Sequence, residues 1–409
     1  MPCVTIFSCD FCHGSSVVKE VLDRTGYRLV TDNNLISEAC KLSGLSSAKI
    51  ESAFTPQTSI FNKFTHEKEH AMAYLKLAMA NLLSGHKQLF AGYLGLLVPR
   101  DISHILNVCL VGDAPFRLKV ANEDQGLSEK EATKVINQLD SERAHWVNNI
   151  YSTEDPWDRS LYDMVIPMSK TSVKDAAVLI EEYLNKDILT PTDTSKRRAA
   201  DFLLAAQVEV ALAKEGHNVD VAANRGKISL TINKNVLMLS RLKEELKTIA
   251  SQVSGVESVE SEIGKGFHKS DIYRKYNFDV PSKVLLIDDE REFVQTLSER
   301  LTLRDMGSAV AEDGESALKM IAQDRPEVIV LDLKMPGIDG IEVLRRVKAS
   351  YPEVEVIILT GHGSEADRKT CMELGAIAYM HKPIDIDKLS RTLEEANQKV
   401  QQAKQKSVN

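Results

Sequence analysis

The chain has 409 residues, of which 43% are hydrophobic and 27% are charged, as is usual for a soluble protein of two to four domains. Its formal net charge of −8 argues against a surface dominated by nucleic-acid binding. The sequence has no apolar run of about 18 residues and no signal-type segment, so we expect a cytoplasmic protein without a membrane partner.

Six cysteines are too few and too scattered for a disulfide framework in a chain of this length. The segment Cys9-Asp-Phe-Cys12-His13 has the spacing of a c-type haem attachment site, and together with Cys3 it has the residue types of a metal site. Haem attachment requires export, and no export signal is visible. We therefore favour reduced thiols in a loop, with a metal or redox role as the alternative.

The first predicted element is a strand at Cys3–Ser8, followed by a loop and a helix, which is the setting of a phosphate-binding loop. Gly14 and Ser16 match the second glycine and the hydroxyl residue of that motif. Cys9 replaces its first glycine, and Ser15 replaces its lysine. A plain helix N-terminus with a serine cap is the alternative interpretation.

Alternating strand and helix patterns continue to about residue 190 and predict a parallel α/β sheet. The expected elements are a strand within residues 27–36 that ends at Asp32, a helix at 71–83, a strand and glycine-rich turn at 87–95, a strand at 105–111, helices that begin near 114 and 127, a strand at 161–166 and a helix at 172–184.

This order of elements resembles the cytidylate kinase-like branch of the nucleoside monophosphate kinases over residues 1–190. Thr31-Asp32-Asn33 matches a Tyr-Asp-Lys-type turn of the family, and Asp140 and Arg143 match a lid-region pattern whose arginines contact phosphates. The resemblance implies a bound nucleotide. The candidate nucleotide-binding residues are Gly14, Ser15, Ser16, Asp32, Arg117 and Arg143.

The loop departs from the family pattern, because it lacks the lysine, and Tyr93 stands where members usually have an arginine. Loss of a cation that neutralises a transferring phosphoryl group costs several kcal/mol of transition-state stabilisation. We therefore expect weak nucleotide binding and poor phosphoryl transfer. Arg117 and Arg143 are alternatively solvated helix charges.

The polar segment 191–198 predicts a domain boundary. The patterns after it predict a helix at 199–215, strands at 218–223 and 227–232, a helix at 240–252 and a strand at 255–263. This αββαβ order resembles a BON-like module over residues 198–263, which implies ligand or partner binding without catalysis. Residues 264–282 mix basic and aromatic side chains, and we expect a linker that packs on a neighbouring domain, with nucleic-acid binding as the alternative.

The strongest signal comes from the C-terminal part of the chain, where short apolar runs end in charged or hydroxyl residues. Residues 328–331 precede Asp332, residues 283–287 precede Asp288 and Asp289, residues 353–359 precede Thr360, and residues 376–380 precede Lys382. The carboxyl ends of parallel strands lie at one edge of the sheet. Carboxylates that converge there repel each other unless a hard cation such as Mg²⁺ neutralises them.

This pattern resembles the receiver domain of two-component response regulators over residues 283–400. The resemblance implies that a histidine kinase or phosphotransfer protein phosphorylates Asp332, and that the receiver self-associates. It implies Mg²⁺ bound by Asp289, Asp332 and the carbonyl of Lys334, with Asp288 acting through water, Lys382 and Thr360 contacting the phosphoryl group, and Tyr379 moving with Thr360 as a switch.

The sequence thus predicts three α/β modules: a P-loop-kinase-like parallel sheet (1–190), a small α+β module (198–263) and a doubly wound five-stranded receiver (283–400) with a tail at 401–409. We expect a response regulator in which phosphorylation of Asp332 controls a nucleotide-kinase-like output or sensor domain. The two alternatives are an active nucleoside monophosphate kinase gated by the receiver and a protein-interaction scaffold that binds no nucleotide.

Overall fold

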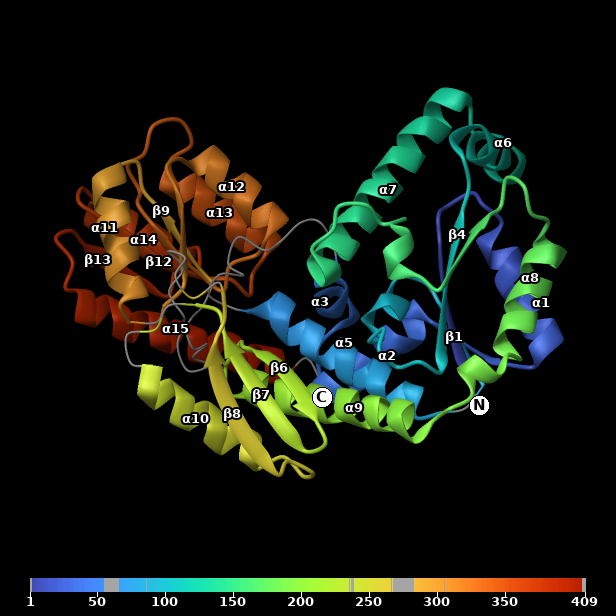
Figure 1. Cartoon of the computed structure of the whole chain (residues 1–409). Coiled ribbons are helices and arrows are strands. Elements are labelled where there is room, and N and C mark those ends of the chain that lie inside the picture. The colour runs from blue at the N-terminus through green and yellow to red at the C-terminus, as the bar shows by residue number, and fades with distance from the viewer. Residues whose placement is uncertain are drawn as a thin grey trace. The chain divides into compact units, whose positions relative to one another are not determined.

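The computed structural model of the chain describes residues 2–54, 66–85, 87–234, 236, 239–265, 267, 283–304 and 306–406. The chain divides into two compact units, of which one contains the N-terminal and middle sheets and the other contains the C-terminal sheet (Figure 1). Among the described helices, none combines the length and apolar character that a membrane crossing needs.

The N-terminal sheet is parallel and has the strand order β2-β3-β1-β4-β5, so the first strand lies at its centre. Because β1 is paired on both sides, its carboxyl end opens between two neighbouring strands, which is where ligands bind in open α/β sheets. The strands are β1 Cys3–Ser8, β2 Arg28–Thr31, β3 Gln88–Ala91, β4 Ile105–Val111 and β5 Met164–Pro167.

Apolar side chains cover both faces of this sheet, with α1 and α8 packed together on one face and α2 and α5 contributing to the core of the other. The helical segments are α1 Gly14–Thr25, α2 Asp32–Ser43, α3 Ser47–Glu51, α5 Glu67–Leu83, η1 Leu94–Leu97, α6 Ala114–Gln125, α7 Glu129–Tyr151, η2 Arg159–Leu161, α8 Val173–Leu184 and η3 Asp187–Leu189.

The second predicted strand is shorter than expected, and Asp32 begins a helix instead of ending a strand. The reason is a capping box, in which the Asn34 side chain accepts a hydrogen bond from the backbone N–H of Thr31 at 2.9 Å. This hydrogen bond caps α2 at Thr31, the last residue of β2, so the helix follows the strand without an intervening loop.

The middle segment has the predicted αββαβ order and forms a mixed three-stranded sheet, with β6 antiparallel and β8 parallel to the central β7. Its elements are α9 Asp193–Lys214, β6 Asp220–Asn224, β7 Lys227–Ile232, α10 Leu239–Ser251 and β8 Ser258–Ile263. Helix α9 packs along α5 of the N-terminal sheet, and Lys76 Nζ lies 2.8 Å from Glu209 Oε1 between them.

Helix α9 begins at Asp193, inside the polar segment 191–198 and earlier than the predicted start at residue 199. Thr192 and Ser195 exchange hydrogen bonds, with the Ser195 N–H donating to Thr192 Oγ1 at 3.1 Å and the Thr192 N–H donating to Ser195 Oγ at 3.0 Å. The polar residues therefore cap a helix. Residues 266 and 268–282 of the expected linker lie outside the described residues, and so does the end of the tail from 407.

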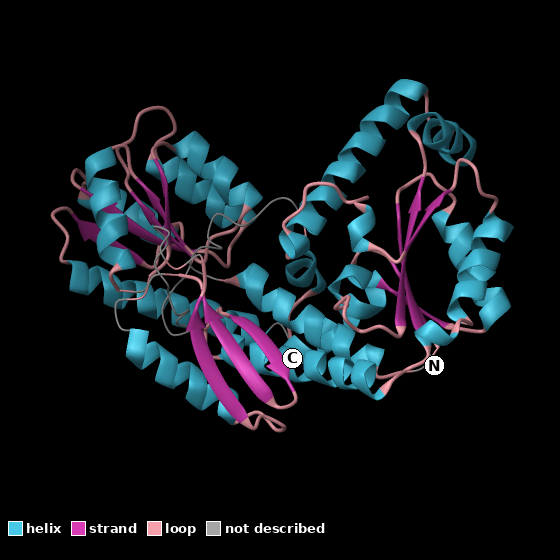
Figure 2. Ribbon diagram, in the orientation of Figure 1, coloured by secondary structure: helices cyan, strands magenta, loops and turns pink. Residues whose placement is uncertain are grey.

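The C-terminal sheet has five parallel strands in the order β10-β9-β11-β12-β13, which confirms the predicted doubly wound fold (Figure 2). Helices α11 and α15 cover one face, and α12, α13 and α14 cover the other. The elements are β9 Val284–Ile287, α11 Arg291–Thr302, β10 Ser308–Ala311, α12 Gly314–Gln323, β11 Val328–Leu331, α13 Gly340–Ser350, β12 Glu355–Thr360, α14 Glu365–Glu373, β13 Ala378–His381 and α15 Ile386–Lys406.

Candidate functional site

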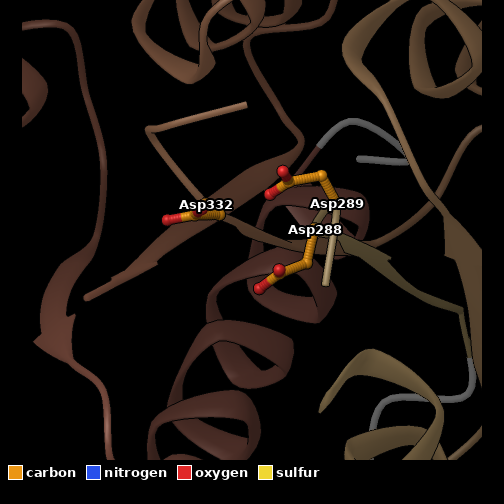
Figure 3. Close-up of side chains that lie close together, drawn as sticks. All are labelled: Asp288, Asp289 and Asp332. Carbon is orange, nitrogen blue, oxygen red and sulfur yellow. The ribbon is translucent and has the colours of Figure 1, made fainter. Parts of the chain in front are cut away.

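Three carboxylates meet at the carboxyl edge of the C-terminal sheet. Strands β9 and β11 pair in parallel with Ile287 beside Leu331, so the residues that follow, Asp288 and Asp332, come to lie next to each other. One oxygen of each of these two and one of Asp289 lie within 4.8 Å of one another (Figure 3). Asp288 and Asp332 are buried and Asp289 is exposed. Short strands in register thus build an acidic pocket with one open side.

Lys382, which follows β13, supplies the positive charge of this pocket. Its Nζ lies 2.8 Å from Asp288 Oδ2 and 2.7 Å from Glu290 Oε1. Burial raises the pKa of Asp288, and the lysine opposes that rise. Burial alone would lower the pKa of Lys382, but the hydrogen bonds to Asp288 and Glu290 raise it above its usual value. The pocket therefore keeps a protonated lysine beside its carboxylates.

The Asp332 carboxylate is oriented by backbone groups. The Leu333 N–H donates to Asp332 Oδ1 at 2.8 Å, and the Asp332 N–H donates to the carbonyl of Ile287 at 2.9 Å. Helix α13 begins against this loop at Gly340, where a Cβ atom would lie 2.1 Å from the carbonyl oxygen of Asp332. Only glycine permits this close approach, so the loop after β11 holds the carboxylate in one orientation.

Thr360 and Tyr379 lie together beside the pocket. Thr360 ends β12 and is fully buried, and its Oγ1 accepts a hydrogen bond from the His362 N–H at 3.3 Å. A Cβ atom added to Gly363 would lie 1.8 Å from the Tyr379 hydroxyl oxygen and 3.1 Å from Thr360 Cγ2. The Tyr379 side chain therefore packs against Gly363, next to Thr360, where a larger residue would leave no room for it. Lys334 lies exposed in the loop after β11.

The donor set of the pocket fits Mg²⁺. Carboxylate oxygens are the ligands that this hard cation prefers, and the three groups are close enough to share one ion. The predicted coordination by the carbonyl of Lys334 and the water-mediated role of Asp288 remain predictions. The pocket as a whole combines carboxylates that fit a cation, an oriented Asp332 and an ammonium group paired with Asp288 and Glu290.

The predicted phosphate loop joins β1 to α1 in the N-terminal sheet. Gly14 packs against Ser8, and a Cβ atom at Gly14 would lie 2.7 Å from Ser8 Oγ. Ser15 and Ser16 are exposed in the first turn of α1, where backbone N–H groups and the helix dipole favour anions.

Arg117 and Arg143 reach this loop from α6 and α7. Both residues are buried, so the interpretation as solvated helix charges is wrong. Arg117 forms a bidentate pair with Asp140 at 2.7 and 2.8 Å, and its Nε donates to the carbonyl of Asp10 at 2.9 Å. Arg143 pairs with the Asp10 carboxylate, and its Nε donates to the carbonyl of Ser8 at 3.1 Å. The loop is thus clamped between two guanidinium groups.

Asp10 was missed by the sequence reasoning. The signal that was available is an acidic residue inside a loop of phosphate-binding type, where negative charge is unexpected. Arg143 also stacks on Tyr93, with its guanidinium carbon 4.9 Å from the ring centroid. Tyr93, at a position where family members usually have an arginine, therefore packs against Arg143.

Asp32 faces the backbone of the next turn. Its two carboxylate oxygens accept hydrogen bonds from the N–H groups of Tyr93 at 2.8 Å and Leu94 at 3.0 Å. Burial raises the pKa of Asp32 to about 6, against the opposing effect of these hydrogen bonds and of Arg143. Gly92 has a φ of 132°, and a Cβ there would lie 2.2 Å from Asp32 Oδ2. Asp32 therefore anchors the turn after β3.

Comparison with known families matches two parts of the chain. Residues 284–394 match the response regulator receiver domain, and residues 3–170 match the cytidylate kinase-like family. Response regulator MprA of Mycolicibacterium vanbaalenii is 34% identical over 110 residues, which are 27% of this chain and 48% of that protein. Response regulator MprA of Mycobacterium avium is 35% identical over 107 residues, 26% of this chain and 47% of that protein. The chain spans about half the length of the curated relatives it matches.

Solved receiver domains resemble the same part of the chain. A response regulator receiver domain protein from Clostridium thermocellum is 30% identical, with a TM-score of 0.29, and the match covers 30% of this chain and 98% of that chain. The receiver domain of the Francisella response regulator 1452 is 30% identical, with a TM-score of 0.28, and the match covers 29% of this chain and 97% of that chain.

Proposed function

We propose that this chain, which joins a cytidylate kinase-like domain (residues 3–170) to a response regulator receiver domain (residues 284–394), accepts a phosphoryl group on Asp332 from a histidine kinase or phosphotransfer protein. The observation that carries the proposal is the cluster of Asp288, Asp289 and Asp332 with Lys382 beside it. The N-terminal domain is then the output or the sensor that the phosphorylated receiver controls.

The chemistry follows from the orientation of Asp332. Its Oδ1 already accepts a hydrogen bond from Leu333, so Oδ2 is the attacking atom. A P–O bond forms as the P–N bond of the donor phosphohistidine breaks, and the electron pair of that bond stays on the imidazole nitrogen. Mg²⁺ held by Asp289, Asp332 and the carbonyl of Lys334, with Asp288 acting through water, would neutralise the incoming negative charge.

Lys382 and Thr360 then act on the product. The Lys382 ammonium group is shared between Asp288 and Glu290, and a short movement brings it to a phosphoryl oxygen. Among the described residues, Thr360 Oγ1 accepts a hydrogen bond from the His362 N–H at 3.3 Å, and this leaves the hydroxyl proton for donation to the phosphoryl group. Both groups stabilise the acyl phosphate once it exists.

A groove next to the acidic pocket, lined by apolar side chains together with Glu292, Thr296 and Arg300, suits the phosphodonor. It has a volume of about 390 Å³ and lies between α11 and the chain after β13. Phe293 lines it and also packs under Lys382, whose Nζ is 4.4 Å from the ring centroid. We propose that the segment of the partner that bears the phosphohistidine docks in this groove, because Phe293 lines the groove and also contacts Lys382 of the acidic pocket.

Dependence on Mg²⁺ tests the function. Incubation of the full chain with acetyl phosphate and Mg²⁺ should give one phosphate per chain, released by hydroxylamine as expected for an acyl phosphate. Chelation of Mg²⁺ should reduce the initial rate by at least about a hundredfold, since a metal ion contributes several kcal/mol to such a transfer. Equal rates with and without the cation would contradict the proposed pocket chemistry.

The switch is tested by Thr360→Ala. The variant should still take up phosphate on Asp332, but it should lose the phosphate-dependent change in hydrogen exchange around Tyr379, because no hydroxyl group draws the loop inward. Thr248→Ala is the matched control, since the Thr248 hydroxyl group donates within its own helix α10, to the carbonyl of Glu244. A response to phosphate that is identical in Thr360→Ala and the parent would remove this residue from the switch.

A second candidate function, nucleoside monophosphate kinase activity gated by the receiver, is favoured by the two buried arginines at the β1–α1 loop. Guanidinium groups in that place suit phosphate recognition. A scaffold without nucleotide binding is the third candidate. Calorimetric binding of ATP, measured together with phosphoryl transfer to each nucleoside monophosphate, separates the three.

A further inference from the structure

Two cysteines flank the turn that joins β1 to α1. Residues 10 and 11 form this turn, and Cys9 and Cys12 stand at its two ends. The ends of a four-residue turn lie within about 7 Å of each other between Cα atoms, and a disulfide bridges Cα atoms about 4.4–6.8 Å apart. The spacing of the two residues across this turn is therefore compatible with a disulfide.

The side chain of Cys12 is folded back over the turn. Its Sγ lies 2.9 Å from the carbonyl oxygen of Cys9. Phe11 and His13, on either side of Cys12, have φ angles of 56° and 58°, in the left-handed region that residues other than glycine rarely adopt. Cys12 thus lies between two residues of costly backbone conformation, and such strain often lies at functional sites.

Two guanidinium groups, each also paired with a carboxylate, flank the first cysteine of the pair. Arg117 donates to the carbonyl of Asp10, and Arg143 donates to the carbonyl of Ser8, so the two guanidinium groups bind the residues immediately after and before Cys9. A hydrogen bond from Cys12 and then the charges of these arginines lower the pKa of Cys9, although burial opposes them. The surroundings favour the thiolate form, which is the nucleophile in thiol chemistry.

The other buried thiols of the N-terminal sheet lack this arrangement. Burial raises the pKa of Cys3 and of Cys109. Cys109 belongs to the core on the opposite face of the sheet from Cys9 and Cys12, so it cannot pair with them. Cys9 and Cys12 thus differ from ordinary core cysteines in both geometry and charge.

We infer that Cys9 and Cys12 form a redox-active dithiol, which a small peroxide oxidises to a disulfide within the β1–α1 loop. The Cys9 thiol gives up its proton, the thiolate attacks one peroxide oxygen, and the O–O bond breaks. The leaving hydroxide takes up that proton, so that water and a Cys9 sulfenic acid result. The Cys12 sulfur then attacks the Cys9 sulfur, and the hydroxyl group leaves with the Cys12 proton as a second water. Two thiols lose two electrons and one peroxide gains them. Because both thiols are nearly fully buried, the oxidant must be as small as hydrogen peroxide.

An experiment on the unsubstituted protein tests whether this disulfide forms. The reduced full-length protein is treated with hydrogen peroxide, denatured, alkylated and analysed by mass spectrometry. Two of its six thiols should escape alkylation, both in the peptide that contains Cys9 and Cys12, and dithiothreitol should restore them. Full alkylation of this peptide, after peroxide has oxidised a low-molecular-weight thiol in the same tube, would overturn the inference.

Single substitutions separate the roles of the two thiols. Each variant is treated with hydrogen peroxide and then denatured in the presence of a cyclic 1,3-dione, which reaches the buried sulfur only after unfolding. In Cys12→Ser the dione should trap a sulfenic acid on Cys9, whereas in Cys9→Ser no adduct should form on Cys12. Cys40→Ser is the matched control and should form the disulfide like the parent, since Cys40 lies on α2 and not in the loop. An adduct on Cys12 in place of Cys9 would contradict the assigned order of attack. If the loop variants do not fold, the parent measurement still decides the pairing.

Discussion

Asp332→Asn is expected to take up no phosphate from acetyl phosphate or from a histidine kinase. Asparagine keeps the shape of the side chain and can still accept the hydrogen bond from the Leu333 N–H, so the loop after β11 should be preserved. The amide group carries no negative charge and is a poor nucleophile, so the P–O bond does not form. The loss should be complete within detection, whether followed by intact mass or by a radioactive phosphodonor.

Asp339→Asn is the matched control for this substitution. Asp339 lies in the same loop and caps α13 by accepting a hydrogen bond from the Glu342 N–H at 2.8 Å. Asparagine caps helices about as well as aspartate does, so stability and phosphate uptake should both stay at the parent level. Labelling that persists unchanged in Asp332→Asn, with Asp339→Asn also unchanged, would place the phosphorylated residue elsewhere.

The C-terminal sheet could be predicted from the sequence because its signals are local. The strands that carry functional residues are short apolar runs, both faces of the sheet are covered, and the functional residue comes shortly after the run, as Asp332 does after Val328–Leu331. The parallel register then fixes which strand ends meet. The start of α9 could not be predicted, since Thr192 and Ser195 suit a loop and a helix cap equally well until their reciprocal hydrogen bonds are known.

The N-terminal site could be predicted only in part, because its contacts join residues far apart in the chain. Arg117 bonds to Asp10 over 107 residues, and Arg143 bonds to Ser8 over 135 residues. A sequence pattern does not distinguish a buried arginine that bonds to the loop after another strand from an arginine on a solvent-exposed helix face. The motif identified the loop, but the residues that pair with Arg117 and Arg143 could be found only in the folded structure.

The carboxylate partners of Arg117 and Arg143 determine how strongly we expect nucleotides to bind. Each guanidinium group at the loop already has a carboxylate, Arg117 with Asp140 and Arg143 with Asp10. A phosphate group must displace a carboxylate that is part of the fold, and the loop offers no lysine in compensation. We therefore expect the full chain to bind ATP weakly and to transfer phosphate far more slowly than the tens of turnovers per second typical of kinases. Turnover at about that rate would promote the kinase function to first place.

Asp10→Asn tests whether the internal carboxylate competes with phosphate. The substitution leaves Arg143 without its charged partner, so a triphosphate no longer has to displace one, and its affinity should rise by roughly tenfold, equal to about 1.4 kcal/mol. Asp113→Asn is the matched control, because Asp113 lies at the neighbouring strand end but caps α6 by accepting from the Phe116 N–H at 3.0 Å. Calorimetric titration of both variants with ATP gives the comparison. Equal affinities in Asp10→Asn, Asp113→Asn and the parent would mean that Asp10 does not occupy the place of a phosphate, and the weakness of nucleotide binding would then follow from the missing lysine alone.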